Sequence, residues 1–192
     1  MSNYKTVFFT IGILQIILGL SMIAPILTQF FYDELDSGFV SSGIATVIFG
    51  ILFLLSNLDH DKKISLPQAF LLTALSWLSI AIFGSLPFIF SEINLSVTDA
   101  FFESMSGITT TGSTIITNLN ETPKSILLWR GMLQWLGGIG IIVMAITLMP
   151  LMNIGGMQLF IVSTSDTPEK ILPRSKEIAW RLILVYSGLT FI

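Results

Sequence analysis

The sequence predicts an all-α, polytopic membrane protein, and three observations support this fold class. Only 11% of the 192 residues are charged, against roughly 25% in an ordinary soluble domain, and 53% are hydrophobic. Four tracts contain no Asp, Glu, Lys or Arg, and each exceeds the roughly 20 residues that a membrane-spanning helix needs. These tracts are residues 7–32, 37–58, 64–91 and 131–165. Their centres are apolar on all sides, whereas a helix of a soluble bundle carries one apolar stripe.

The basic residues predict the orientation, because Lys and Arg collect on the cytoplasmic side of short loops. If each tract crosses once, seven of them fall on the side of the N terminus: Lys5, Lys62, Lys63, Lys170, Arg174, Lys176 and Arg181. Only Lys124 and Arg130 fall on the other side. We therefore expect a multi-pass protein of the cytoplasmic (inner) membrane with a cytoplasmic N terminus.

The composition also argues against catalysis. Cysteine is absent, which excludes disulfides, thiolate metal sites and cysteine nucleophiles, and the single histidine, His60, falls in a short loop. Asp99 and Glu103 lie four residues apart, but we interpret Asp99 as a helix-dipole residue and Glu103 as lining the mouth or pairing with another group. An ion pair of Arg130 with Glu103 or Asp99 is one such pairing. We expect no enzymatic activity.

The segment between the third and fourth tracts, residues 92–121, is too apolar for an ordinary external loop. Ser96–Asp99 has the form of a capping box, which predicts a helix from about residue 98 to residue 108. Such a helix is about 15 Å long, half the thickness of the hydrocarbon core. Because both ends of the segment lie outside, the sequence predicts a re-entrant half-helix rather than another crossing.

After the half-helix come residues 109–114, TTTGST, for which we predict an extended strand. Consecutive backbone carbonyls in such a strand can replace the water shell of a monovalent cation. Gly112 permits a backbone conformation that turns its neighbours' carbonyls to one side. The pattern Gly107 to Ser113 lacks the lysine of a phosphate-binding loop, and Gly137–Gly140 lies in an apolar tract, where small residues indicate close helix packing.

Three stretches together carry a resemblance to a known family. They are DAFFESMSGITTTGST (99–114), LWRGMLQWLGGIGII (128–142) and GGMQLF (155–160). They closely resemble the Trk-type potassium-uptake membrane subunit, of the Trk/Ktr/HKT superfamily of cation transporters. The resemblance runs from the first residue to the last.

The resemblance implies four repeats of helix, pore half-helix, filter and helix around one central pathway, preceded by two extra helices. Residues 1–62 then hold the extra pair, and residues 63–160 the first repeat. Within it, 66–90 is the outer helix, 98–108 the pore half-helix, 109–114 the filter and 125–152 the inner helix. Residues 161–192 would be a cytoplasmic loop and the start of a second, truncated repeat, so the sequence resembles an N-terminal fragment.

The resemblance also implies the function, the site and the partners. Potassium is the transported ion, and the filter carbonyls come from Thr110, Thr111 and Gly112, with Thr109 and Ser113 next. Potassium is a substrate, and no organic cofactor is expected. Expected partners are the lipid bilayer, the remaining three repeats, a second copy in a homodimer and a cytoplasmic nucleotide-binding regulatory subunit, which would contact residues 163–176. No nucleic acid is expected.

Two other functions remain open at this point. One is a less selective sodium and potassium channel or transporter of the same superfamily, and the other is a membrane scaffold that transports nothing. The scaffold leaves the apolar segment 92–121 and its Thr-Thr-Thr-Gly sequence without a purpose.

The predicted orientation can be tested by labelling, since the chain contains no cysteine. A single cysteine at His60 should react with an impermeant thiol reagent only from the cytoplasmic side. A single cysteine at Asn120 should react only from the outside. The opposite labelling would reverse the arrangement that the basic residues predict.

Overall fold

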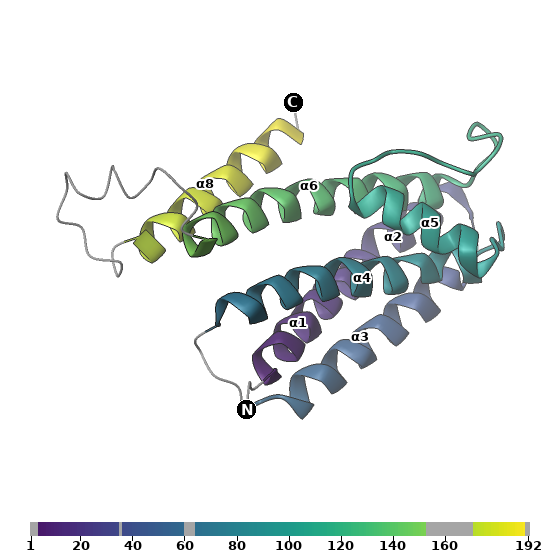
Figure 1. Ribbon diagram of the computed structural model, residues 1–192. Coiled ribbons are helices and arrows are strands. Elements are labelled where there is room, and N and C mark those ends of the chain that lie inside the picture. The colour runs from purple at the N-terminus through teal and green to yellow at the C-terminus, as the bar shows by residue number, and fades with distance from the viewer. Residues whose placement is uncertain (1–3, 35, 60–63, 153–170, 191–192) are drawn as a thin grey trace. The chain divides into compact units, whose positions relative to one another are not determined.

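The computed structural model describes residues 4–34, 36–59, 64–152 and 171–190, and every regular element in these residues is a helix. In chain order the helices are α1 (Lys5–Ser21), α2 (Ile23–Tyr32), α3 (Gly38–Ser56), α4 (Leu66–Phe90), α5 (Val97–Ile108), α6 (Lys124–Met152) and α8 (Ile171–Thr190) (Figure 1). Four stretches are long and apolar enough to cross a membrane: Lys5–Tyr32, Gly38–Ser56, Leu66–Phe90 and Lys124–Met144. The prediction of an all-α, polytopic membrane protein is confirmed.

The first predicted span is divided in two at Met22, and Pro25 explains the break. Proline has no N–H, and its ring clashes with the carbonyl four residues earlier, which here belongs to Ser21. The helix accordingly ends at Ser21 and starts again at Ile23, while the N–H of Met22 donates to the carbonyl of Gly19 at 3.2 Å. The tract remains apolar throughout, so only Pro25 marks the break in the sequence.

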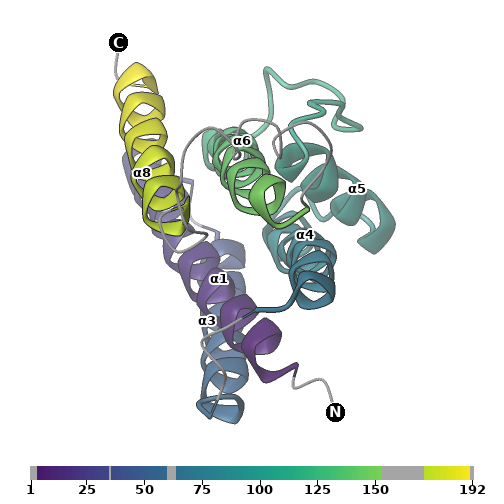
Figure 2. The ribbon, with the colours of Figure 1, turned by 60° about the vertical axis from the view of Figure 1, so that its left-hand side comes forward.

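The chain forms two compact units, residues 1–137 and 138–192, and α6 passes from the first into the second. In the first unit α1, α3 and α4 lie side by side and α5 packs against α4 (Figures 1 and 2). Glycines allow α1 and α3 to approach closely. A Cβ atom added at Gly12 or at Gly50 would lie 2.8 Å from the carbonyl oxygen of the other glycine. Small residues at such an interface let the helix backbones approach closely, and this packing contributes to helix association in lipid.

A buried apolar core connects the N-terminal helices with α4, α5 and α6 in the first unit. Phe39 of α3 meets Trp129 of α6 edge to face, with 6.1 Å between the ring centroids, and both side chains are fully buried. The indole N–H of Trp129 donates to the carbonyl of Gly84 in α4 at 3.0 Å. The remaining buried members of this core are Leu18, Met22, Phe88, Ala100, Ile126 and Leu133.

The linker between α2 and α3 caps the start of α6. Pro123 is the residue directly before α6, and its side chain cannot accept hydrogen bonds from the first N–H groups of the helix. The carboxylate of Glu34 accepts them instead. Glu34 accepts from the N–H groups of Lys124, at 2.6 Å, and Ser125, at 3.1 Å, and from the Ser125 hydroxyl at 2.8 Å. The next acid in the linker, Asp36, accepts from the N–H groups of Gly38, at 2.8 Å, and Glu92, at 3.1 Å.

The pKa of Glu34 is lowered by these contacts. Burial raises the pKa of the carboxyl group, but hydrogen bonds from Lys124 and Ser125, with the positive charge of Lys124, outweigh burial. A lowered folded-state pKa means that the charged cap stabilises the fold above the unfolded pKa of about 4.3. The stabilisation is lost as the pH falls through the lower pKa of the folded state.

We therefore expect Glu34→Gln to lower the free energy of unfolding by about 1 kcal/mol at pH 7, as loss of a helix cap does. The difference from the wild type should shrink as the pH falls below about 4. Thermal unfolding in detergent at several pH values measures both. Glu121→Gln is the matched control, because the exposed Glu121 carboxylate makes no hydrogen bond within the described residues. Equal melting of all three proteins at pH 7 would contradict the cap.

Candidate ion-coordinating segment

The candidate site begins with the short helix α5, whose start follows from its sequence. Ser96 is the N-cap, and its hydroxyl accepts from the N–H of Asp99 at 3.2 Å. Asp99 stands in the first turn, where the helix dipole favours a negative charge. The helix has 12 residues, about 18 Å of rise, which is too short to cross a bilayer.

The end of α5 is a Schellman motif with threonine in the position that glycine usually occupies. The N–H of Thr110 donates to the carbonyl of Gly107 at 2.9 Å, and the N–H of Thr111 donates to that of Ser106 at 3.0 Å. Thr110 has φ of 58°, a left-handed conformation that costs a β-branched residue about 1 to 2 kcal/mol. The predicted extended strand over residues 109–114 is therefore wrong at its start, because the helix ends through a left-handed turn.

This turn and Gly112 carry four consecutive backbone carbonyl groups, and we call residues 109–113 the carbonyl-bearing segment. The carbonyl oxygens of residues 109–112 accept no hydrogen bond from any described residue. Gly112 has φ of 78°, so it adopts the conformation that the sequence assigned to a glycine here. A Cβ atom at Gly112 would lie 3.5 Å from Gln134 Nε2, an ordinary contact, so conformation and not space requires glycine. Residues 110–113 are exposed and Thr109 is half-buried.

The carbonyl of Ser113 differs from the four before it. It accepts from the hydroxyl of Ser106 at 2.6 Å, across the turn that ends α5. The carbonyl of Ser106 in turn accepts from the N–H groups of Thr111 and Gly112, the latter at 3.2 Å. The five predicted residues thus lie together after α5, with four carbonyls free of hydrogen bonds and the fifth held by α5.

Glu103 of α5 holds the two residues that follow the carbonyl-bearing segment. Its side chain is buried, with 1% of the residue exposed, and it forms an ion pair with Arg130 of α6. The other carboxylate oxygen accepts from the Thr114 hydroxyl and from the N–H of Ile115, both at 3.1 Å. Of the two ion pairs proposed for Arg130, the one with Glu103 is confirmed.

Close packing fixes α5 between α4 and α6. A Cβ atom at Gly84 would lie 2.7 Å from Ser104 Oγ, and one at Gly137 would lie 1.9 Å from the carbonyl oxygen of Ile108. The interpretation of the glycines near residue 137 as a packing surface is therefore confirmed for Gly137. The C-terminal end of α5, with its partial negative charge, lies directly before the row of carbonyls.

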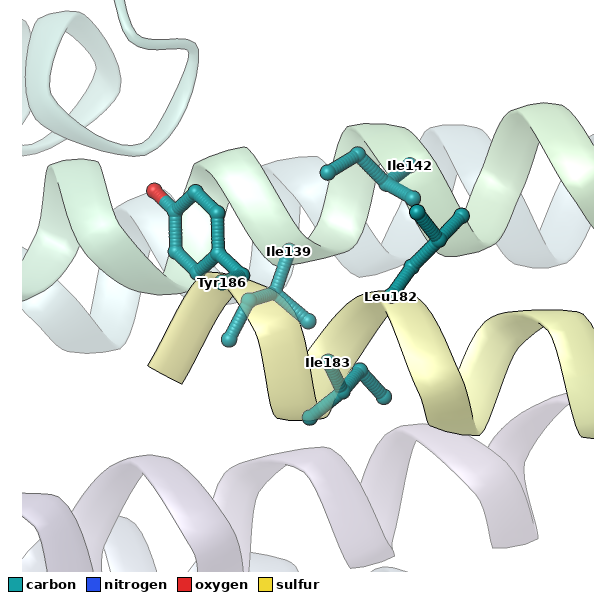
Figure 3. A pocket seen from close by; sticks show the side chains of 5 residues that line it. All are labelled: Ile139, Ile142, Leu182, Ile183 and Tyr186. Atoms are coloured by element: carbon teal, nitrogen blue, oxygen red, sulfur yellow. The ribbon is translucent and has the colours of Figure 1, made fainter. Parts of the chain in front are cut away.

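The second unit offers no comparable site in its described residues. A small apolar pocket there is lined by Ile139 and Ile142 of α6 and by Leu182, Ile183 and Tyr186 of α8 (Figure 3). One phenol is the only polar group in this lining, too little to orient a ligand. His60 and the greater part of the loop expected to contact a regulatory subunit, residues 163–170, lie outside the described residues.

Two contacts of the first unit were not predicted, one in the site and one at the start of α6. The bond between Ser106 and Ser113 follows no sequence pattern that we could recognise. The Glu34 cap joins residues about 90 positions apart, so no local pattern indicates it. A serine in a predicted half-helix reads as an ordinary polar residue until the turn is known. The left-handed Thr110 could only have been suspected from the two bonds that end α5.

The helices and this segment define a polytopic membrane protein in which a short helix is followed by a segment of free carbonyls. Residues 36–192 match the TrkH family, described as cation transport protein. The chain belongs to this family of cation transporters, which are not enzymes.

Individual relatives agree over almost the whole chain. The chain is 38% identical to the Trk system potassium uptake protein TrkI of Halomonas elongata, covering 100% of this chain and 39% of the relative. It is 38% identical to the Trk system potassium uptake protein TrkH of Vibrio parahaemolyticus, covering 98% and 40%. The crystal structure of the potassium transporter TrkH from Vibrio parahaemolyticus superposes with a TM-score of 0.84 at 35% identity, covering 99% and 38%. The chain thus spans about two fifths of the length of these relatives.

The support that Glu103 gives the segment can be tested with a double-mutant cycle. Arg130→Gln leaves the Glu103 carboxylate buried without its partner and should lower the free energy of unfolding by about 3 kcal/mol. Glu103→Gln should also destabilise. The double variant should lose less than the sum of the two, because neither charge is left unpaired. Thermal unfolding in detergent gives all four values, and strictly additive losses would show that the two groups do not interact.

Proposed function

We propose that this chain contributes to potassium uptake across the cytoplasmic membrane, through a central pore lined by the backbone carbonyls of filter segments. The observation that carries the proposal is the row of carbonyls at residues 109–112, which follows the negative end of α5 and accepts no hydrogen bonds from the described residues. The names of the relatives TrkI and TrkH support potassium as the ion.

The chemistry is an exchange of ligands. A potassium ion that leaves water must receive replacement oxygens, and backbone carbonyls supply them without adding a fixed charge. The carbonyls of residues 109–112 provide these oxygens from one side of the ion. Ser113 is the last residue of the segment. The dipole of α5 adds a favourable potential for a cation.

One such segment offers only one wall of a pathway. We therefore propose that the other three sides come from the remaining three repeats of the longer protein, of which this chain supplies one filter segment in four. The chain would span the membrane with a cytoplasmic N terminus, because of its basic residues, and would work without an organic cofactor. A homodimer and a cytoplasmic nucleotide-binding regulatory subunit complete the proposed assembly.

The filter assignment is tested in a full-length membrane subunit that carries this 192-residue segment. Gly112→Ala and Gly112→Ser place a Cβ on a residue with φ of 78°, a strain of about 1 kcal/mol or more that turns a carbonyl away. Potassium uptake, or its preference over sodium, should fall clearly in both. The measurements are uptake into potassium-depleted cells and its inhibition by sodium.

Thr110→Val is the comparison variant, because it keeps the β-branched shape and removes a hydroxyl that makes no hydrogen bond to the described residues. It should reduce uptake much less than the glycine variants. Wild-type uptake and selectivity in both glycine variants, at matched expression, would refute the filter. Equal uptake of sodium and potassium by the unaltered protein would instead favour the less selective cation transporter.

A further inference from the structure

Ser106 makes more contacts to the carbonyl-bearing segment than any other residue of α5 described above. It is 5% exposed and uses both its backbone and its side chain. Its carbonyl accepts from the N–H groups of Thr111 and Gly112, and its hydroxyl donates to the carbonyl of Ser113 at 2.6 Å. Three consecutive residues of the segment are therefore tied to this one serine.

The two kinds of contact have different sequence requirements. Any residue at position 106 could supply the backbone carbonyl, since it belongs to the Schellman motif that ends α5. The bond to Ser113 requires a hydroxyl group, or a comparable donor, on a short side chain. Position 106 therefore carries a specific requirement that lies outside the segment itself.

The hydroxyl bond determines where the row of free carbonyls stops. Residues 109–112 have carbonyls with no hydrogen bond in the described part of the chain, whereas the carbonyl of Ser113 is directed to α5. Residues 110–113 are exposed, and the next contacts along the chain are those of Glu103 with Thr114 and Ile115. Without the bond, no hydrogen bond would hold the Ser113 carbonyl itself, and Glu103 would restrain this end only through Thr114 and Ile115. The geometry of the preceding carbonyls would then be less tightly fixed.

We propose that Ser106 is a positioning residue for ion selectivity: its hydroxyl holds the Ser113 carbonyl and thereby fixes the geometry of the carbonyls at residues 109–112. The proposal rests on the proposed function of these carbonyls in potassium uptake. A loosened segment adapts to ions of other sizes, so discrimination between potassium and sodium falls more than transport itself.

Ser104 provides a matched control in the same helix. It lies two residues before Ser106, is fully buried, and its hydroxyl has no hydrogen-bond partner among the described residues. It faces Gly84 of α4 and not the carbonyl-bearing segment. Ser104→Ala therefore removes the same atom from the same half-helix without breaking a bond to the segment.

The experiment compares Ser106→Ala, Ser106→Cys, Ser106→Thr and Ser104→Ala in a full-length membrane subunit that carries this segment. Uptake of potassium and of sodium is measured at matched expression in the membrane. Ser106→Ala should lower the potassium over sodium preference about three- to tenfold, the range expected for one lost hydrogen bond. Ser106→Cys, with a weak thiol donor, should also lower it, while Ser106→Thr and Ser104→Ala should stay within about twofold of the wild type.

The proposal is overturned if Ser106→Ala keeps the wild-type preference, or if Ser106→Thr falls as far as Ser106→Ala. Should Ser106→Ala fail to reach the membrane, equal preferences in the Cys and Thr variants would overturn it instead. The Gly112 variants separate this result from the underlying function. If they abolish selective uptake while Ser106→Ala does not, only the role of Ser106 is wrong. If they too transport normally, the filter assignment itself fails.

Discussion

The buried carboxylate of Glu103 is the contact on which the arrangement of the first unit around α5 depends. One oxygen meets Arg130 of α6, and the other accepts from Thr114 and Ile115, which follow the carbonyl-bearing segment. A buried charge without partners is unstable, so the carboxylate is stable only when α5, α6 and the returning chain are all in place. The side chain of Glu103 thus connects α5, α6 and the chain that follows the candidate site.

Most of the fold could be predicted because the bilayer imposes simple rules on sequence. The charge-free tracts correspond to helices α1 with α2, α3, α4 and α6, and the serine before α5 caps it as its spacing indicates. These are local or compositional properties, readable from a few neighbouring residues. The break at Met22 is local too, but an apolar tract conceals it, and only Pro25 marks the place.

The candidate site was predictable in its position and less so in its geometry. Gly112 has a positive φ, as glycine commonly does. Thr110 also has a positive φ, which is unusual for a β-branched residue. The difference arises because the end of α5 imposes the conformation on Thr110 through two hydrogen bonds. The pairing of Ser106 with Ser113, and of Glu34 with α6, depends on distances in the folded chain, which a single sequence does not contain.

The linker between α2 and α3 also bears on how such a chain can evolve. Because proline directly precedes α6, the first N–H groups of the helix donate to Glu34, about 90 residues earlier, and not to a neighbouring side chain. Deleting the segment from α1 to α3 would remove Glu34 and therefore also uncap α6. A shortened descendant would need a second change in the same lineage, a serine, threonine, aspartate or asparagine in place of Pro123, before its helix regained a cap of its own. The N-terminal spans and the start of α6 are consequently coupled through Glu34, although the two partners lie far apart in the sequence.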